Sequence, residues 1–109
     1  MNKTKRTRLE ARGWRVGSAK DFLGLSPEEA ALVETRLALS HAVRSRRVAH
    51  GLTQGELARR LKSSQSRVAK MEAGDKTVSV DLLVKALFSL GARPRDVGRV
   101  LQGRGSAAA

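Results

Sequence analysis

Four polar side chains at helical spacing carry the clearest chemical signal in this sequence. Gln65, Ser66 and Arg67 stand in a row, and Lys70 follows about one helical turn later. Amides, hydroxyls and cations of this kind pair with base edges in the major groove of DNA or with its phosphates. The row therefore predicts a nucleic-acid contact, provided that a helix presents it to solvent.

Two short helices with clear start signals are predicted to position this row. Thr53 and Glu56 have the spacing of a capping box, and the helix that they begin is expected to stop near Lys62. Ser63 and Ser64 then cap a second helix over 65–73, and its apolar residues face inward: Val68 and Met71. Two short helices joined by a tight turn are the helix-turn-helix arrangement, in which the second helix enters the major groove.

Helical patterns also flank this unit. Ser26-Pro27-Glu28-Glu29 starts a helix that nothing interrupts before Gly51. Two further helices are expected before Gly91 and from Pro94 to Leu101, and no segment shows the alternation of a strand. The sequence thus predicts an all-α fold: a five-helix DNA-binding domain over 39–102, a helical extension over 18–38 continuous with its first helix, and a loose tail over 103–109.

The first seventeen residues differ from the rest in composition. They contain six basic residues and one acid and lack apolar periodicity, so we expect a flexible basic arm over 1–17. Trp14 is interpreted as a docking residue that packs the arm onto the body. A partner-binding anchor is the alternative interpretation of Trp14.

Composition excludes several classes of function. The 109 residues suffice for one domain, and a net charge of +12 favours a polyanionic partner. Aromatic residues make up only 3 %, too few for a platform that stacks single-stranded bases. No apolar run is long enough for a membrane span, and the basic N-terminus lacks the apolar core of a secretory signal, so a cytoplasmic protein is expected.

The residues needed for catalysis or metal binding are also missing. The absence of Cys removes disulfides, thiolate metal sites and Cys nucleophiles. His41 and His50 have no ligand set around them, so we expect neither a metal nor another cofactor. No paired carboxylates, Ser/His/Asp set or phosphate-binding Gly loop is present, which indicates that the protein is not an enzyme.

The segment LTQGELARRLKSSQSRVAKMEAG, residues 52–74, resembles the XRE family of lambda-repressor-like and Cro-like helix-turn-helix proteins. The resemblance continues through VSVDLLVKALFSLGARPRDV and covers about residues 39–101. It implies a five-helix fold that binds operator DNA. The implied base-reading residues are Gln65, Ser66 and Lys70. The implied phosphate contacts are Gln54, Lys62, Ser64, Arg67, Lys76 and Thr77.

The same resemblance implies a structural ion pair and shows one departure. Arg47 and Glu72 stand where many members hold a buried pair that joins the first and third helices. In the turn, where the family usually has a left-handed Gly, this chain has Lys62. A non-Gly residue there costs on the order of 1 kcal/mol, which a phosphate contact by Lys62 would offset. The alternative is a slightly different turn, which would change the aim of Gln65.

The region before the helix-turn-helix resembles the N-terminal extension of HigA-type antitoxins, the XRE-family partners of RelE-like (HigB) toxins. The similar stretch is GWRVGSAKDFLGLSPEEAALVETRLALSHAVRSRR. The resemblance implies a bacterial protein that represses its own operon, resides at the nucleoid when bound there, and blocks a toxin that cleaves messenger RNA. The residues implied to bind the toxin are apolar beyond the needs of the core: Trp14, Phe22, Leu32, Val33 and Leu37.

Two alternatives to the antitoxin remain open at the level of sequence. One is an XRE repressor without a toxin, whose extension serves dimerisation or docking of the arm. The other is an interaction module that has kept the fold but not DNA binding. A homodimer is expected on DNA, because one recognition helix covers too few base pairs for useful specificity. The last helix and the extended first helix are both candidate dimer surfaces.

Overall fold

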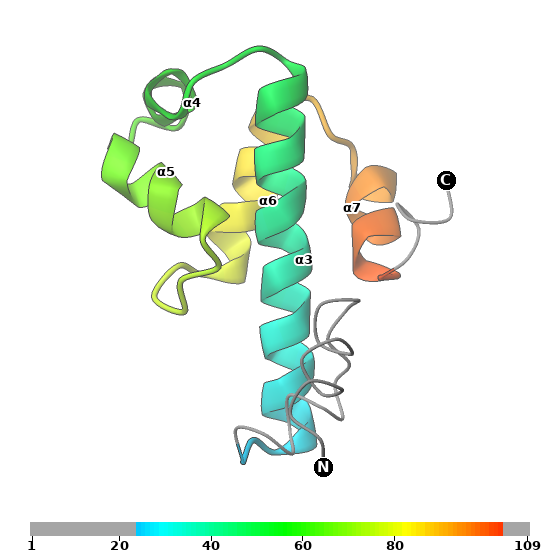
Figure 1. Cartoon of the computed structure of the whole chain (residues 1–109). Helices are drawn as coiled ribbons and strands as arrows, with labels where there is room; N and C mark the ends of the chain where they lie inside the picture. Colours follow the sequence, from blue (N-terminus) through cyan, green and yellow to red (C-terminus); the bar gives the residue numbers. More distant parts are fainter. Residues whose placement is uncertain (1–23, 104–109) are drawn as a thin grey trace, which may run out of the picture. The chain divides into compact units, whose positions relative to one another are not determined.

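The computed structural model describes residues 24–103, and these residues contain five helices and no strand. The helices are α3 (Pro27–Ala49), α4 (Gln54–Leu61), α5 (Gln65–Glu72), α6 (Val80–Ser89) and α7 (Pro94–Leu101) (Figure 1). The predicted all-α, five-helix fold is confirmed. The predicted arm, the start of the extension and most of the tail lie outside the described residues, as do Trp14 and Phe22.

The chain divides into two compact units, Met1–Glu34 and Thr35–Ala109, which are described separately. Of the first unit, the described part is residues 24–34, which include the start of α3. Ser26 Oγ accepts the backbone N–H of Glu29 at 3.1 Å, and a Glu29 carboxylate oxygen accepts the N–H of Ser26 at 2.9 Å. This reciprocal capping box, followed by Pro27, explains why the helix begins where the sequence predicts.

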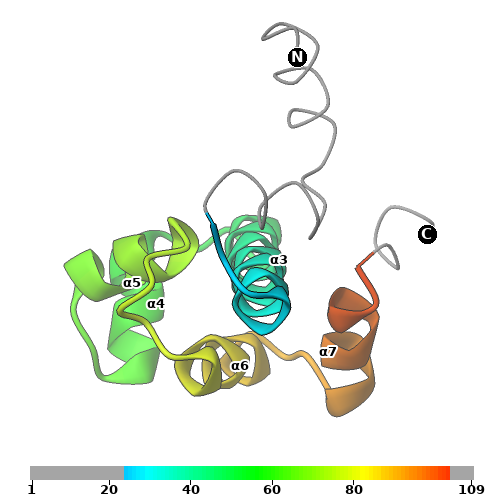
Figure 2. The ribbon, with the colours of Figure 1, turned by 90° about the horizontal axis from the view of Figure 1, so that it is seen from below.

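The second unit is built around one apolar core. Its buried residues come from all five helices: Leu39 and Val43 of α3, Leu57 of α4, Val68 and Met71 of α5, Leu83 and Leu87 of α6, and Val97 of α7. Each fully buried side chain of this size contributes about 1.5–3 kcal/mol. In Figures 1 and 2, α5 and α7 lie on opposite sides of α3. The core therefore holds the helix-turn-helix on one side of α3 and leaves α7 on the other.

Gly74 ends the helix-turn-helix at a point where no other residue fits well. Its φ is +75°, and a Cβ built there would lie 2.7 Å from Cδ2 of Leu37. A side chain at this position would be strained because of the positive φ, whereas the Leu37 methyl is the end of an exposed, flexible side chain and could move aside. The left-handed backbone of Gly74 turns the chain from α5 into the loop that leads to α6.

None of the helices among residues 24–103 is long and apolar enough to cross a membrane.

Candidate nucleic-acid interface

The start of α5 is fixed by a side-chain cap. Ser64 has extended backbone angles, and its Oγ accepts the N–H of Arg67 at 3.1 Å. The Ser64 hydroxyl also lies 3.3 Å from that of Ser66. The cap leaves the Ser64 hydroxyl proton free to turn toward Ser66 or toward a phosphate. The proposed phosphate contact of Ser64 is thus compatible with its role at the helix start.

The turn before α5 contains a left-handed residue, as the resemblance to the XRE family implies. Lys62 has φ 55° and ψ 48° and is the one non-Gly residue with positive φ in the described chain. The N–H of Ser63 donates to the carbonyl of Ala58 at 2.8 Å and closes the end of α4. The turn therefore keeps its left-handed geometry although the residue is Lys, and the alternative of a different turn is wrong. The Lys62 side chain is exposed beside the start of α5.

The polar row predicted on α5 faces solvent. Gln65, Ser66, Arg67 and Lys70 are all exposed, and we call them the recognition row. Val68 and Met71, on the opposite side of the same helix, are fully buried. The helix cannot rotate about its axis without exposing these two residues to water. The core thus fixes which side of α5 a DNA duplex would meet.

A buried ion pair ties α5 to α3. Arg47 Nε lies 2.6 Å from Glu72 Oε2, and Arg47 donates a second bond to Glu72 Oε1 at 3.0 Å. A third Arg47 N–H donates to the carbonyl of Leu52 at 2.7 Å. The hydrogen bond and the charge of Glu72 raise the pKa of Arg47. The pair predicted from the sequence is present, and it is bidentate, the strongest geometry for these groups.

Gln54, at the first position of α4, joins this pair. Its side-chain N–H donates to Glu72 Oε1 at 3.1 Å, so the carboxylate orients the amide. A Gln amide has two N–H donors, and the second remains for a phosphate oxygen. The phosphate contact of Gln54 stays a prediction, but the structure supplies what would hold the side chain in place for it.

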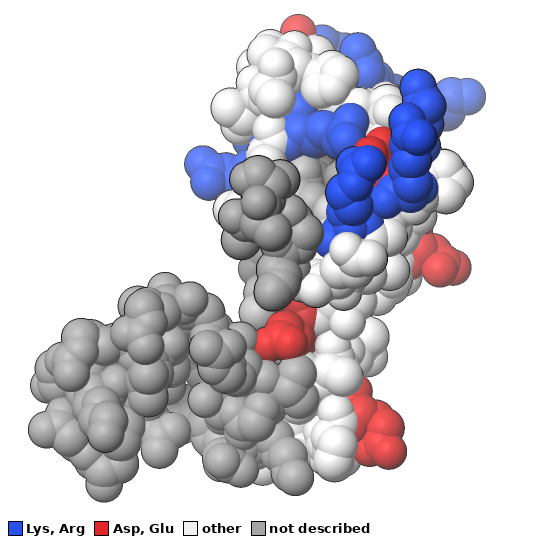
Figure 3. All heavy atoms as spheres, turned by 90° about the vertical axis from the view of Figure 1, so that its right-hand side faces the viewer, with Lys and Arg blue, Asp and Glu red and all other residues white. Residues whose placement is uncertain are grey.

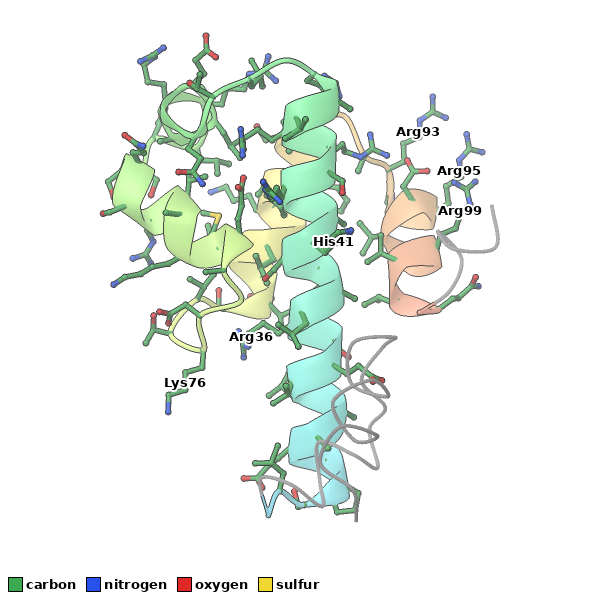
Figure 4. The ribbon with its side chains drawn as sticks, viewed as in Figure 1. Arg36, His41, Lys76, Arg93, Arg95 and Arg99 are labelled. Atoms are coloured by element: carbon green, nitrogen blue, oxygen red, sulfur yellow. The ribbon has the colours of Figure 1, made fainter. Side chains whose placement is uncertain are left out.

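The loop after α5 presents one cation and one hydroxyl that is already in use. The hydroxyl of Thr77 donates to Asp75 Oδ1 at 2.5 Å, and its backbone N–H donates to the same oxygen at 2.7 Å. These bonds lower the pKa of Asp75. The pairing competes with the predicted phosphate contact of Thr77. Lys76, by contrast, extends away from the loop (Figure 4).

Sequence reasoning missed the group that holds this loop. Arg36 of α3 donates a side-chain hydrogen bond to the carbonyl of Val78, 42 residues further along the chain. No short-range pattern connects two residues so far apart. Arg36 lies near the loop that carries Lys76 in Figure 4, so it anchors the segment from which Lys76 extends.

A second cationic surface, on the side of α7, was also missed (Figure 3). Asp96 of α7 pairs with Arg99 at 2.9 Å and with Arg46 of α3 at 3.8 Å. Arg93 and Arg95 are exposed beside them. Each of these Arg residues is separate in sequence from the recognition row, so the row alone gives no hint of the cluster.

The apolar residues predicted to bind a toxin are partly accessible where they can be described. Leu32 is 48 % exposed, Leu37 is 44 % exposed, and Val33 is half-buried. Within residues 24–103, no group of His, Asp or Glu side chains has the arrangement of a metal site.

Residues 43–92 match the sequence model of the helix-turn-helix family. The matched region includes α4, the turn and the whole of α5, together with the Arg47–Glu72 pair. No curated protein and no solved structure shows a significant match to the chain. The match, which covers less than half of the chain, supports a helix-turn-helix in a DNA-binding transcription regulator.

Proposed function

We propose that this protein is an antitoxin that represses its own toxin–antitoxin operon as a dimer on operator DNA and neutralises a RelE/HigB-like toxin. The DNA-binding part rests on one observation above all. The first turn of α5 exposes Gln65 and Ser66, while the same helix is locked in rotation by Val68 and Met71. A helix held in this way can present the same side chains to the same base pairs at every encounter.

Roles within the interface follow from chemistry. Gln65 donates and accepts through one amide, which allows a bidentate contact to adenine, and Ser66 and Lys70 reach neighbouring base edges. Arg67, Lys62 and Lys76 contribute cations for phosphates, which set affinity and register but carry no sequence information. The proposed protein acts in the cytoplasm, at the nucleoid when bound to its operator, and has no catalytic role.

The DNA proposal is tested by measuring the affinity of the full chain for its own promoter and for a scrambled duplex of equal length. Specific complexes are typically about 10³-fold or more tighter than non-specific ones. We expect such a ratio, together with a marked loss of affinity as salt is raised. Equal affinity for the two duplexes at every salt concentration would reject sequence-specific binding.

The antitoxin proposal is supported by the apolar side chains that α3 leaves in water. Leu32 and Leu37 are close to half exposed, although each would contribute to a core if buried. Apolar groups left accessible in this way mark a surface for a protein partner. With Val33, and with Trp14 and Phe22 outside the described residues, they form the proposed toxin contact.

A growth-rescue assay tests this part. The gene next to the one for this chain is expressed alone and together with it. Arrest by the neighbour alone and recovery on co-expression is the expected result, and Leu32→Asp should abolish the recovery while leaving promoter binding intact. A neighbour without toxicity, or the lack of a small basic reading frame beside the gene, would favour the stand-alone XRE repressor. Failure to bind the promoter would favour an interaction module that has kept only the fold.

A further inference from the structure

Four arginine side chains form a cationic surface on the side of the second unit that carries α7. They come from the end of α3, the residue before α7 and α7 itself, and we call them the α7 cluster: Arg46, Arg93, Arg95 and Arg99. Figure 3 looks at this face and shows basic side chains gathered on it. In Figure 4, Arg93, Arg95 and Arg99 extend on the same side of α7, away from α3. All four members are exposed or partly exposed.

One carboxylate holds the α7 cluster together. Asp96 Oδ1 accepts a hydrogen bond from Arg99 at 2.9 Å, and its Oδ2 lies 3.8 Å from Nη2 of Arg46. Asp96 Oδ2 also accepts the backbone N–H of Arg93 at 2.8 Å. This N–H, with the charges of Arg99 and Arg46, lowers the pKa of Asp96. A guanidinium has five N–H donors, so the two that contact Asp96 keep donors for another ligand.

Most of the charge of the cluster is not neutralised within the described chain. Four guanidinium groups stand against the single carboxylate of Asp96, and Arg93 and Arg95 make no ion pair with any residue of 24–103. The rest of the chain is a poor source of anions, because 1–23 carry seven basic residues against two acids and 104–109 carry no acidic side chain. The cluster therefore calls for an external anion.

Phosphates suit this surface better than a protein partner. The planar fork of Arg binds a phosphate through two parallel hydrogen bonds. A protein interface is usually built around buried apolar anchors. Val48 and Leu101, the exposed apolar residues nearest to the cluster in sequence, each stand two positions from one of its Arg residues, about 200° around the helix. A two-fold contact with a second copy would set these cations against each other.

The α7 cluster lies away from the duplex that α5 is proposed to read. In Figures 1 and 2, α5 and α7 lie on opposite sides of α3, and a helix with its side chains is about 10–12 Å across. A duplex seated against the first turn of α5 is thus separated from α7 by α3. No residue of the recognition row belongs to the cluster, so the cluster stays open when the row is occupied.

We propose that the α7 cluster is a second DNA site, which binds the phosphates of another duplex segment while α5 holds the operator. Its contacts are to the backbone, so they are independent of sequence. One chain can then bridge two stretches of DNA. The inference goes beyond the proposed operator contact, which uses α5 alone.

A capture assay on the full chain tests the second site. The promoter duplex is fixed to beads and saturated with protein, and a labelled random duplex is then added. Wild type should retain the labelled duplex, and Arg95→Glu should lower its retention by about tenfold or more at equal protein loading. Lys85→Glu, an exposed site on α6 with the same change of charge, is the matched control and should retain the duplex as wild type does. No retention by wild type, or equal retention by wild type and Arg95→Glu, would overturn the proposal.

Photo-cross-linking locates the two duplexes, because the chain has no Cys of its own. Gln102→Cys places a cross-linker three positions after Arg99, on the same side of α7, and keeps every Arg of the cluster. Ala73→Cys places it three positions after Lys70 of the recognition row. The first should attach to the labelled random duplex and the second to the promoter. Attachment of both to the promoter alone would overturn the second site.

Poly-L-glutamate separates DNA from an acidic protein segment as the partner. A duplex carries one negative charge per about 1.7 Å of its axis, so a random duplex should compete for the captured DNA more strongly than poly-L-glutamate at equal total charge. Stronger competition by poly-L-glutamate would assign the cluster to an acidic protein segment and overturn the DNA assignment.

The second site and the operator proposal fail separately. A chain that prefers its promoter but captures no second duplex would reject the role of the α7 cluster and leave the operator proposal standing. A chain without promoter preference, whose binding to any duplex is weakened by Arg95→Glu and not by Lys85→Glu, would do the reverse.

Discussion

At the scale of single residues, the interface depends on side chains that serve stability and recognition together. Glu72 is the clearest case, since its carboxylate accepts bonds from Arg47 and from Gln54. The same group therefore holds α5 against α3 and orients a predicted phosphate contact. The effects of a substitution at Glu72 on stability and on DNA affinity should therefore be measured separately.

Removing Arg47 should destabilise the fold strongly. The Glu72 side chain is only 4 % exposed, so Arg47→Ala leaves an unpaired carboxylate in a poorly hydrated place. Loss of one partner of such a pair costs about 3–5 kcal/mol. Urea unfolding followed by circular dichroism measures the change. Arg46→Ala, which removes a more exposed 3.8 Å pair, is the control and should cost less than about 1 kcal/mol. Similar losses for the two variants would contradict the structural role of Arg47.

Lys62 is expected to lower the stability of the fold and to raise the affinity for DNA. Its left-handed backbone is strained, so Lys62→Gly should stabilise the fold by up to about 1 kcal/mol. Lys62→Ala keeps the strain and loses the same cation. If Lys62 contacts a phosphate, both variants lose affinity for specific and for random duplexes alike. Unfolding and fluorescence anisotropy on the two variants separate the effects, and unchanged affinity in both would remove Lys62 from the interface.

At the scale of elements, the helix boundaries were predictable because local groups set them. Thr53 with Glu56 and Ser64 with Arg67 form caps within four residues of each other, so the sequence contains the whole signal. The contacts between helices were harder to predict from the sequence than the helix boundaries. The Arg47–Glu72 pair was found only through family resemblance, and the bonds from Arg36 to Val78 and from Gln54 to Glu72 were missed. Nothing in the local sequence distinguishes the partners, Val78 and Glu72, from other backbone or side-chain acceptors.

The cap of α4 should matter to stability in a way that depends on pH. Thr53→Ala removes the acceptor for the Glu56 N–H and should cost about 1 kcal/mol near neutrality. The N–H and side chain of Thr53 lower the pKa of Glu56 below its ordinary 4.5. A lowered folded-state pKa contributes stability above the unfolded value, and this contribution is lost as the pH falls. Thr53→Ala keeps the backbone N–H, the larger cause, and loses only the hydroxyl, so the difference between wild type and Thr53→Ala should shrink on acidification by the share of the hydroxyl alone. Unfolding curves at several pH values check this, and a difference that grows in acid would be contrary to it.

At the scale of the whole molecule, the charge is unevenly spread. Residues 1–17 carry a net +5, whereas residues 53–76, which include α4 and α5, carry +3. The helix-turn-helix is thus only mildly basic, and its case for DNA rests on the capped, rotation-locked α5. The largest share of charge lies outside the described residues and can raise affinity without specifying sequence.

Deleting residues 1–17 should weaken binding to the promoter and to random DNA by the same factor. The salt dependence of both complexes should become shallower, because fewer counterions are released. Anisotropy titrations over a range of salt concentrations measure the slope. A loss confined to the promoter would show instead that the arm reads sequence.

The central claim is that α5 reads bases through its exposed first turn, and Gln65→Ala tests it most directly. Affinities of wild type and variant are measured on the promoter duplex and on a scrambled duplex of equal length. The account predicts a loss of about 1–3 kcal/mol on the promoter, the typical value for one bidentate base contact, and almost none on the scrambled duplex. Equal losses on the two duplexes, with the fold intact by circular dichroism, would contradict it.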